Sequence, residues 1–281
     1  MDASSQFLLE TAAKHFVFVV YKARRPQDPE GAFQLCWMSC FVVEVHGTWF
    51  VMTAGHVIRR MKERIAAGVR VWRFELYDRL AGNDFPGIPF EFDPEQWGVV
   101  EDIPLEGTDY AIAMLSSIQA LGLAKGGVVP VSEHLWGPPP YAAYDQWLLV
   151  GAPDEGYKFQ GGIHHLNLTI IPLTPCDPPS GVSRREDARV WGKIVTQPDK
   201  DKVYIENIEG MSGGPIFGLK RMEGGSRYWV IGIQSSWFHD SRIVSFCPVP
   251  PFLNSVKQAV EQLVGLELGQ EGKAGGPADL N

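Results

Sequence analysis

Apolar and polar residues alternate over short stretches through most of the chain, which is the pattern of strands with one buried face. Residues 69–77 (VRVWRFELY) show this alternation, whereas residues 16–21 (FVFVVY) and 109–115 (DYAIAML) are almost wholly apolar and predict buried strands. Segments rich in glycine and proline separate the strands. Many short strands divided by turns predict an all-β protein built from barrels or sandwiches.

The predicted strands fall into two groups. In the first group, a hairpin over residues 41–53 turns at residues 46–48. The strands predicted for the second group are residues 146–151, 163–171, 189–195, 203–205, 228–235 and 242–246. A linker-like stretch at 121–140, with a run of three prolines, places the boundary between them. We therefore expect one β-domain over residues 16–120 and a second over residues 121–250.

Helical periodicity appears near both ends of the chain. Residues 3–14 predict a short amphipathic helix with Ser4 or Ser5 as its N-cap, and residues 251–266 have apolar positions at helical spacing. A further short helix is expected over residues 58–67, with its arginines and lysine facing solvent. Outside the two β-domains, we therefore expect an N-terminal helix within 1–15, a C-terminal helix within 251–269 and a flexible tail at 270–281.

Charge and length narrow the classes of function. The chain has 281 residues and a net charge of −8, which disfavours general binding to nucleic acid or to anionic membranes. The first residues lack the basic and apolar regions of a signal peptide, and residues 16–21 are too short to span a bilayer. We expect a cytoplasmic protein without a membrane partner.

The cysteines predict free thiols. The sequence has four of them, and without an export signal disulfides are not expected. Cys36 and Cys40 have a C-x3-C spacing, but no matching second pair completes a zinc site. We therefore expect no metal and no other cofactor.

A serine in a glycine-rich turn is the first candidate for chemistry. Residues 209–215 read EGMSGGP, and three glycines so close together suit a sharp turn that exposes backbone N–H groups. The N–H groups of Gly210 and Ser212 could both point inward and hold an oxyanion. Such turns are common, so Ser212 needs a base and an orienting acid elsewhere in the chain.

The candidate base is His56, at the end of the apolar hairpin and behind Ala54 and Gly55. Most lone histidines are structural or exposed. His46 belongs to a turn, and the neighbours His164 and His165 would point to opposite faces of one strand. The candidate acid is Asp109, which leads a buried strand and could alternatively cap a turn. Asp102, in an acidic loop, fits less well.

These three segments resemble a known family. TAGHV around His56, TDYAIAML around Asp109 and GMSGGP around Ser212 are similar to the signature segments of trypsin-like, chymotrypsin-fold serine peptidases, in the same order. The resemblance covers roughly residues 16–250. It implies two antiparallel six-stranded β-barrels with the active site between them, and His56, Asp109 and Ser212 as a catalytic triad. The terminal helices would be additions.

Two positions depart from the secreted members of that family. Val57 stands where they have a disulfide-bonded cysteine, which agrees with a reduced compartment. Met211 stands where the zymogen-type members have an aspartate that pairs with a newly cut N-terminus. The chain therefore looks more like the bacterial or intracellular branches, and another interaction must hold the turn around Ser212.

The same resemblance gives two expectations for substrate specificity. Glu206, six residues before the serine, would form the floor of a pocket that selects lysine or arginine, or alternatively would leave its strand into solvent. Gln234, Ser235 and Ser236 would form the pocket wall, and their strand would pair with the backbone of a peptide.

The sequence thus predicts a serine endopeptidase that acts on protein or peptide substrates. Two alternatives remain. One is a protease-fold module that binds peptides without cutting them. The other is a latent effector that a partner or ligand activates.

Overall fold

The structure is a computed structural model that describes residues 11–77, 87–101, 107–160, 163–165, 168–182, 189–195, 206–223 and 225–271. Most of the predicted N-terminal helix, the predicted strand at 203–205 and nearly all of the predicted tail lie outside these ranges. Residues 11–13 are helical. No helix in the described part of the chain is long and apolar enough to cross a membrane.

The first half of the chain forms a seven-stranded antiparallel sheet in the order β5-β4-β1-β2-β3-β7-β6. Its strands are β1 (Phe16–Arg24), β2 (Gln34–Val45), β3 (Thr48–Thr53), β4 (Arg70–Tyr77), β5 (Ile88–Pro89), β6 (Gly98–Glu101) and β7 (Asp109–Met114). A closed six-stranded barrel was predicted here. Within the described residues the sheet stays open, because its edge strands β5 and β6 are short and do not pair with each other.

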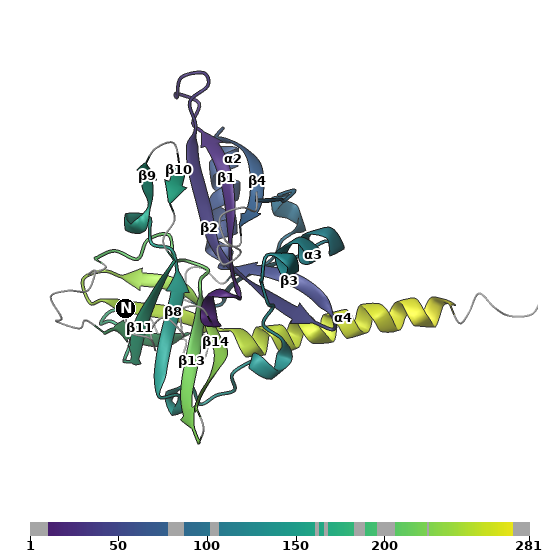
Figure 1. The fold of residues 1–281 in the computed structure, drawn as a ribbon, viewed down its shortest axis with the longest axis vertical. Helices are drawn as coiled ribbons and strands as arrows, with labels where there is room; N and C mark the ends of the chain where they lie inside the picture. Colours follow the sequence, from purple (N-terminus) through teal and green to yellow (C-terminus); the bar gives the residue numbers. More distant parts are fainter. Residues whose placement is uncertain are drawn as a thin grey trace, which may run out of the picture.

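The second half forms a closed six-stranded barrel in the order β11-β12-β15-β14-β13-β8, as the sequence predicted. Its strands are β8 (Gln146–Gly151), β11 (Thr169–Pro175), β12 (Val190–Ile194), β13 (Pro215–Met222), β14 (Gly225–Phe238) and β15 (Ile243–Pro248). A separate hairpin joins β9 (Lys158–Gln160) to β10 (Ile163–His165). Figure 1 shows the open sheet above and the barrel below.

Besides the helical residues 11–13, three α-helices and four short 3-10 segments accompany the strands in the described part of the chain. The helices are α2 (Gly55–Ala66), α3 (Ser117–Lys125) and α4 (Val249–Glu271). The 3-10 segments are η1 (Pro94–Gln96), η2 (Glu133–Leu135), η3 (Tyr141–Ala143) and η4 (Asp154–Gly156). The sequence pattern did not predict helix α3, because half of the helix falls in the stretch at 121–140 that was interpreted as a linker. Ser116 and Gln119 form a capping box at its start.

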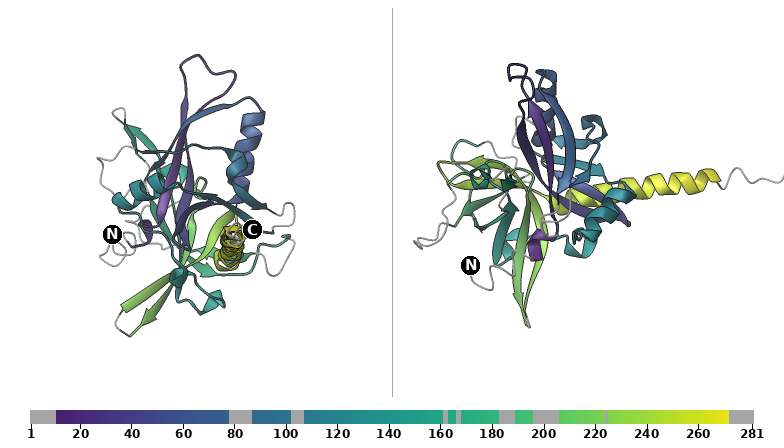
Figure 2. Two further views of the ribbon diagram at one scale, coloured as in Figure 1. Left: turned by 90° about the vertical axis from the view of Figure 1, so that its right-hand side faces the viewer. Right: turned by 45° about the horizontal axis from the view of Figure 1, so that its top comes forward.

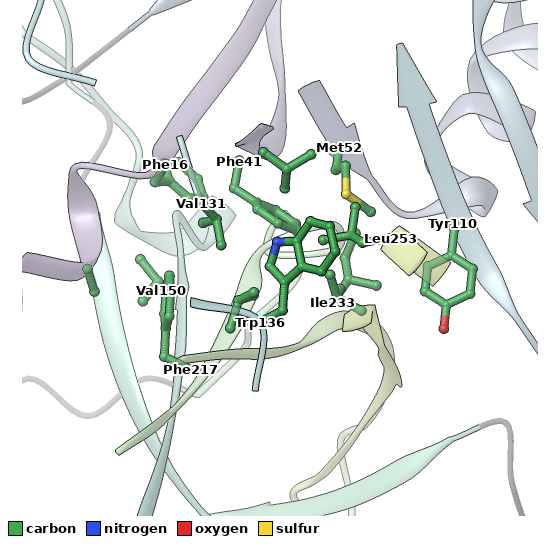
Figure 3. Close-up of a cluster of buried hydrophobic side chains, with 14 of the residues drawn as sticks. Phe16, Phe41, Met52, Tyr110, Val131, Trp136, Val150, Phe217, Ile233 and Leu253 are labelled. Carbon is green, nitrogen blue, oxygen red and sulfur yellow. The ribbon is translucent and has the colours of Figure 1, made fainter. Parts of the chain in front are cut away.

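A continuous hydrophobic cluster joins the two halves. Phe41 and Met52 from the first sheet pack in one cluster with Phe217 and Ile233 from the barrel. Figure 3 shows these side chains gathered around Trp136. Each half also has its own core, one between the first sheet and α2 and one inside the barrel. Since the shared cluster is buried, it fixes the position of one half against the other.

The C-terminal helix packs against the same cluster. Leu253 is fully buried, and the ring of Phe252 stacks on Tyr110 with 4.4 Å between ring centroids. The Tyr110 hydroxyl donates a hydrogen bond to the Pro248 carbonyl oxygen, 2.6 Å away, just before α4 begins. From there α4 runs away from the rest of the molecule (Figures 1 and 2). Its first turns therefore fasten β7, and with it Asp109, to the barrel.

Candidate active site

A carboxylate and an imidazole meet where β7 begins and α2 begins. Asp109 is the first residue of β7, and its Oδ2 lies 2.7 Å from His56 Nδ1. Its Oδ1 accepts a hydrogen bond of 2.8 Å from the backbone N–H of His56. The N-cap residue of α2, Ala54, offers no side-chain cap, so Asp109 also satisfies a free N–H at the start of that helix.

Gly55 makes this approach sterically feasible. A Cβ added at Gly55 would lie 3.1 Å from Asp109 Oδ1 and 3.0 Å from the Tyr110 carbonyl oxygen. Those contacts are tight enough to push β7 away from α2. The glycine that precedes the histidine therefore has a packing reason, and it lets one carboxylate contact both the backbone and the ring of His56.

Asp109 receives a third hydrogen bond from the other half of the molecule. The Ser235 hydroxyl, on β14 of the barrel, donates to Asp109 Oδ2. Burial by itself raises the pKa of the Asp109 carboxyl, but the hydrogen bonds and charge of His56, together with the Ser235 hydrogen bond, outweigh burial and lower the pKa to about 2. Asp109 is thus a carboxylate at neutral pH.

The ionised carboxylate sets the tautomer of His56. Because Asp109 Oδ2 is an acceptor, it keeps a proton on Nδ1 and leaves Nε2 of the neutral ring as the atom that can accept one. The side chain of His56 is 12% exposed and that of Asp109 is 3% exposed. The imidazole can therefore reach a ligand while the carboxylate stays protected from water.

The turn that carries Ser212 needs its glycines. Gly210 has φ +89° and Gly213 has φ +90°, values that L side chains rarely adopt. A Cβ at Gly213 would collide with Thr53 Oγ1, and one at Gly210 would collide with Asp154 Oδ1. The Met211 N–H donates to the Ile208 carbonyl oxygen over 3.1 Å, which closes the turn before the serine.

Two peptide planes in this turn are fixed through their carbonyl oxygens. The Glu209 oxygen accepts from the Asp154 N–H at 2.7 Å, and the Met211 oxygen accepts from the Gly214 N–H at 2.8 Å. In a trans peptide the N–H points opposite to the carbonyl, so the N–H groups of Gly210 and Ser212 are oriented as well. Neither donates a hydrogen bond to any described residue.

Two further contacts hold the turn without a charge at position 211. The Ser39 hydroxyl, fully buried on β2, donates to the Gly210 carbonyl oxygen at 2.7 Å. The Met211 side chain is fully buried in the barrel core and packs beside Gly151. A buried apolar side chain and a neutral hydrogen bond thus hold the turn.

The predicted site residues face one cleft, with a single exception. The cleft has a volume of about 610 Å³, and its lining includes His56, Asp109, Gly210, Ser212, Gln234, Ser235 and Ser236. Ser212 makes no hydrogen bond to His56 in the described part of the chain. Glu206 does not line the cleft: its side chain is exposed, and its backbone N–H donates to Glu155 Oε1 over 3.1 Å.

Several residues that line or support the cleft were not singled out from the sequence. Arg189 lines it and donates to the hydroxyls of Ser236 and Ser245, at 2.6 and 2.9 Å. Ser39 gave no sequence signal beyond a hydroxyl in an otherwise apolar strand. The role of Asp154 is carried by its backbone, which no sequence pattern reveals. The second candidate acid, Asp102, lies outside the described residues.

Other predicted groups lie apart from the cleft. All four cysteines fall in the described ranges and are reduced, with Cys40 and Cys247 fully buried. Within the described residues, no group of three or more histidine, cysteine or acidic side chains is placed to hold a metal ion. His46 is exposed and contacts Glu261 at 2.9 Å.

Comparisons with known proteins give distant structural similarity alone. The chain is 15% identical to a thermostable serine protease, AL20, from an extremophilic microorganism, with a TM-score of 0.42 over 85% of this chain and 92% of that one. It is 12% identical to a catalytically inactive tobacco etch virus protease complexed with substrate, with a TM-score of 0.42 over 86% and 81% of the two chains.

No family model matches the chain. No curated protein matches it. Similarity this distant transfers no residue role, so the role of each side chain in the cleft has to follow from its contacts within the chain.

The three hydrogen bonds to Asp109 lead to a pKa prediction. Ser235→Ala removes one donor to the carboxylate and should raise the Asp109 pKa from about 2 toward its ordinary value of 3.8. Carbon NMR of the labelled carboxyl group would measure both values. Ser236→Ala is the matched control, because that hydroxyl contacts Arg189 and should leave the Asp109 pKa unchanged.

The same shift sets a window of pH-dependent stability. Because the folded-state pKa lies below the unfolded one, ionised Asp109 stabilises the fold above about pH 4, and this contribution is lost as the pH falls toward 2. The loss of stability across this window should be smaller in Ser235→Ala than in the wild type. An equal loss would contradict the role of Ser235 as a donor to Asp109.

Proposed function

We propose that the chain is a serine endopeptidase that cleaves peptide bonds through a Ser212-His56-Asp109 triad. The observation that carries the proposal is the paired geometry of His56 and Asp109 in a cleft that Ser212 also lines. The carboxylate fixes the imidazole with its proton on Nδ1, and the imidazole and the serine line the same cleft.

In the proposed reaction, Ser212 Oγ attacks the carbonyl carbon of the scissile bond while His56 Nε2 takes the hydroxyl proton. The tetrahedral intermediate then collapses, the C–N bond breaks, and His56 returns the proton to the leaving amine. Water next attacks the acyl-enzyme with His56 again as base, which releases the acid and restores Ser212. Asp109 stays ionised and stabilises the imidazolium that forms in each step.

The oxyanion would be held by the N–H groups of Gly210 and Ser212. Their peptide planes are fixed by Asp154 and Gly214, so the donors need not reorganise when negative charge develops on the substrate oxygen. The geometry of the turn, with both donors uncommitted among the described residues, supports a hole that is formed before substrate binds.

The proposal does not include a preference for basic residues. That expectation depended on Glu206, whose side chain is exposed and outside the cleft lining. A latent effector is the second candidate, because Ser212 and His56 share no hydrogen bond among the described contacts. A non-catalytic peptide-binding module has no comparable observation in its favour.

Labelling with a fluorophosphonate probe tests the proposed nucleophile. The wild type should be labelled, whereas Ser212→Ala should lose labelling completely and His56→Ala should lose it by at least about a hundredfold, because no base remains to take the hydroxyl proton. Ser255→Ala, which changes an exposed hydroxyl on α4, is the matched control and should label like the wild type.

The outcomes separate the alternatives. Labelling that appears only after a cell extract is added would favour the latent effector. A wild type that binds peptides but is never labelled and never cleaves them would overturn the enzyme proposal.

The hydroxyl of Ser39 provides a test of the oxyanion turn. Ser39→Ala removes the donor to the Gly210 carbonyl oxygen, and kcat should fall about tenfold with KM nearly unchanged, because the affected interaction forms in the transition state. Initial rates on a cleaved peptide, corrected by active-site titration, would measure both constants. If the titrated enzyme kept its full kcat and only its melting temperature fell, Ser39 would be structural and not a positioning residue.

A further inference from the structure

Three cations gather on one face of the first sheet, where β1 ends and β4 begins. Lys22 and Arg24 lie on the same face of β1, because Ala23 between them is buried on the opposite face, in the core beside α2. In the register with β4, Lys22 lies opposite Trp72 and Arg24 lies opposite Arg70. This end of β1 is at the top of Figure 1, far from the hairpin of β13 and β14 at the bottom.

Two aromatic rings lie among these cations. Phe33, just before β2, has its ring centroid 6.3 Å from that of Trp72, in an edge-to-face arrangement. Lys22 Nζ lies 4.0 Å from the centroid of the Phe33 ring, and the guanidinium carbon of Arg70 lies 5.4 Å from that of Trp72. We call these five residues, Lys22, Arg24, Phe33, Arg70 and Trp72, the basic-aromatic face.

The positive charges of the basic-aromatic face are not balanced within the described part of the chain. Arg24 and Arg70 are direct partners across two strands, an arrangement in which like charges repel. Glu75, further along β4, already interacts with Arg73 at 3.7 Å and accepts a hydrogen bond from the Tyr77 hydroxyl at 2.9 Å. None of the three cations forms an ion pair with a described carboxylate. A bound anion would therefore relieve the repulsion.

The backbone of β4 is irregular at this face. The pairing of β1 with β4 shifts register between Val20 and Lys22, and Arg73 at this shift has φ +60°, a value that L side chains rarely adopt. Without the extra residue, Arg73 would lie opposite Lys22, and Trp72 and Arg70 would turn toward α2. The strained bulge thus brings a tryptophan and an arginine onto the basic-aromatic face, and such strain is often found at functional sites.

The size and chemistry of the basic-aromatic face suit a short acidic peptide. The face spans three neighbouring strands, roughly 10 Å, and alternate residues along a strand are about 7 Å apart, so about four residues of an extended peptide would cover it. Carboxylates would pair with Lys22 and the two arginines, of which each arginine can bind in a bidentate way. An apolar side chain between the carboxylates would pack on Phe33, which is 45% exposed.

Nucleic acid fits the same face less well. The chain has a net charge of −8, so a polyanion that continues beyond the face would meet a repulsive surface. Lys22 and Arg70 already lie over the rings of Phe33 and Trp72, which leaves fewer ring faces on which bases could stack.

We propose that the basic-aromatic face binds an acidic segment of a partner protein, with an apolar side chain of that segment placed between its carboxylates. The basic-aromatic face shares no residue with the lining of the cleft. The inference therefore does not depend on the proposed function and can be tested by binding alone.

Fluorescence polarisation with the full chain tests this binding. The probe is a labelled octapeptide of aspartate and glutamate with one central phenylalanine. It should bind at least about tenfold more tightly than a peptide with lysine in place of every acid, and about threefold more tightly than one with serine in place of the phenylalanine. Its affinity should fall at least about fivefold between about 50 mM and about 500 mM salt, because the contacts are exposed ion pairs.

Charge reversal should then reverse the preference. A chain with both Lys22→Glu and Arg70→Glu should lose at least about tenfold in affinity for the acidic peptide and gain affinity for the lysine peptide, a gain that a misfolded protein would not show. The matched control is Lys220→Glu with Arg227→Glu, an exposed cross-strand pair on β13 and β14. It changes the net charge equally and should keep the original ranking.

A single substitution tests the apolar contact. Phe33→Ser should remove the preference for the phenylalanine peptide over the serine peptide and leave the preference for acidic over lysine peptides in place. An equal preference in Phe33→Ser and in the wild type would contradict the contact with Phe33.

Other outcomes would overturn the inference. These are equal binding of the acidic and lysine peptides, an effect of the control pair as large as that of the Lys22 and Arg70 pair, and no binding of any peptide. Tighter binding of a twelve-nucleotide oligothymidylate than of the acidic peptide would overturn it in favour of nucleic acid. Labelling of Ser212 is measured separately, so each of these results leaves the endopeptidase proposal standing.

Discussion

The carboxylate of Asp109 is the point at which the helix start, the imidazole and the two halves of the chain meet. It accepts hydrogen bonds from the backbone and ring of His56 and from the hydroxyl of Ser235, which lies 126 residues further along the chain. A buried charge is tolerated only when such donors surround it. The same contacts that stabilise ionised Asp109 in the interior therefore hold α2 against β7, and β7 against β14.

The turn around Ser212 is also held by several contacts at once, but here the groups are uncharged. Backbone hydrogen bonds from Asp154 and Gly214 orient two peptide planes, Ser39 fixes a third, and Met211 anchors the turn in the barrel core. These contacts are a buried apolar side chain and hydrogen bonds between neutral groups, so no charged group is needed to hold the turn. The proposed oxyanion hole thus rests on the packing of the two halves, which the cluster around Phe41 and Phe217 maintains.

The sequence predicted those parts of the fold and site that depend on local pattern. The strand alternation and glycine positions placed β4, β7, β8 and the serine turn, and glycine spacing marked the turn because positive φ angles leave few other residues. The sequence-based prediction failed where the pairing of distant strands determines the structure. The first sheet stays open because its edge strand β5 has only two residues, and no sequence pattern indicates so short a strand. Glu206 was placed by distance along the chain, yet the Glu155 carboxylate holds the backbone N–H groups of Glu206 and Asn207 while the Glu206 side chain stays exposed. Ser39 and Asp154 act through single long-range hydrogen bonds that no local motif encodes.

A crystal structure of the chain after reaction with a peptide boronic acid would test the proposed nucleophile and oxyanion hole together, because boron mimics the tetrahedral carbon of the intermediate. We expect a covalent bond from boron to Ser212 Oγ, with one boronate oxygen within hydrogen-bond distance of the N–H groups of Gly210 and Ser212. A boronate bound to another residue would contradict the proposed chemistry. So would an adduct on Ser212 whose oxygens meet neither N–H group.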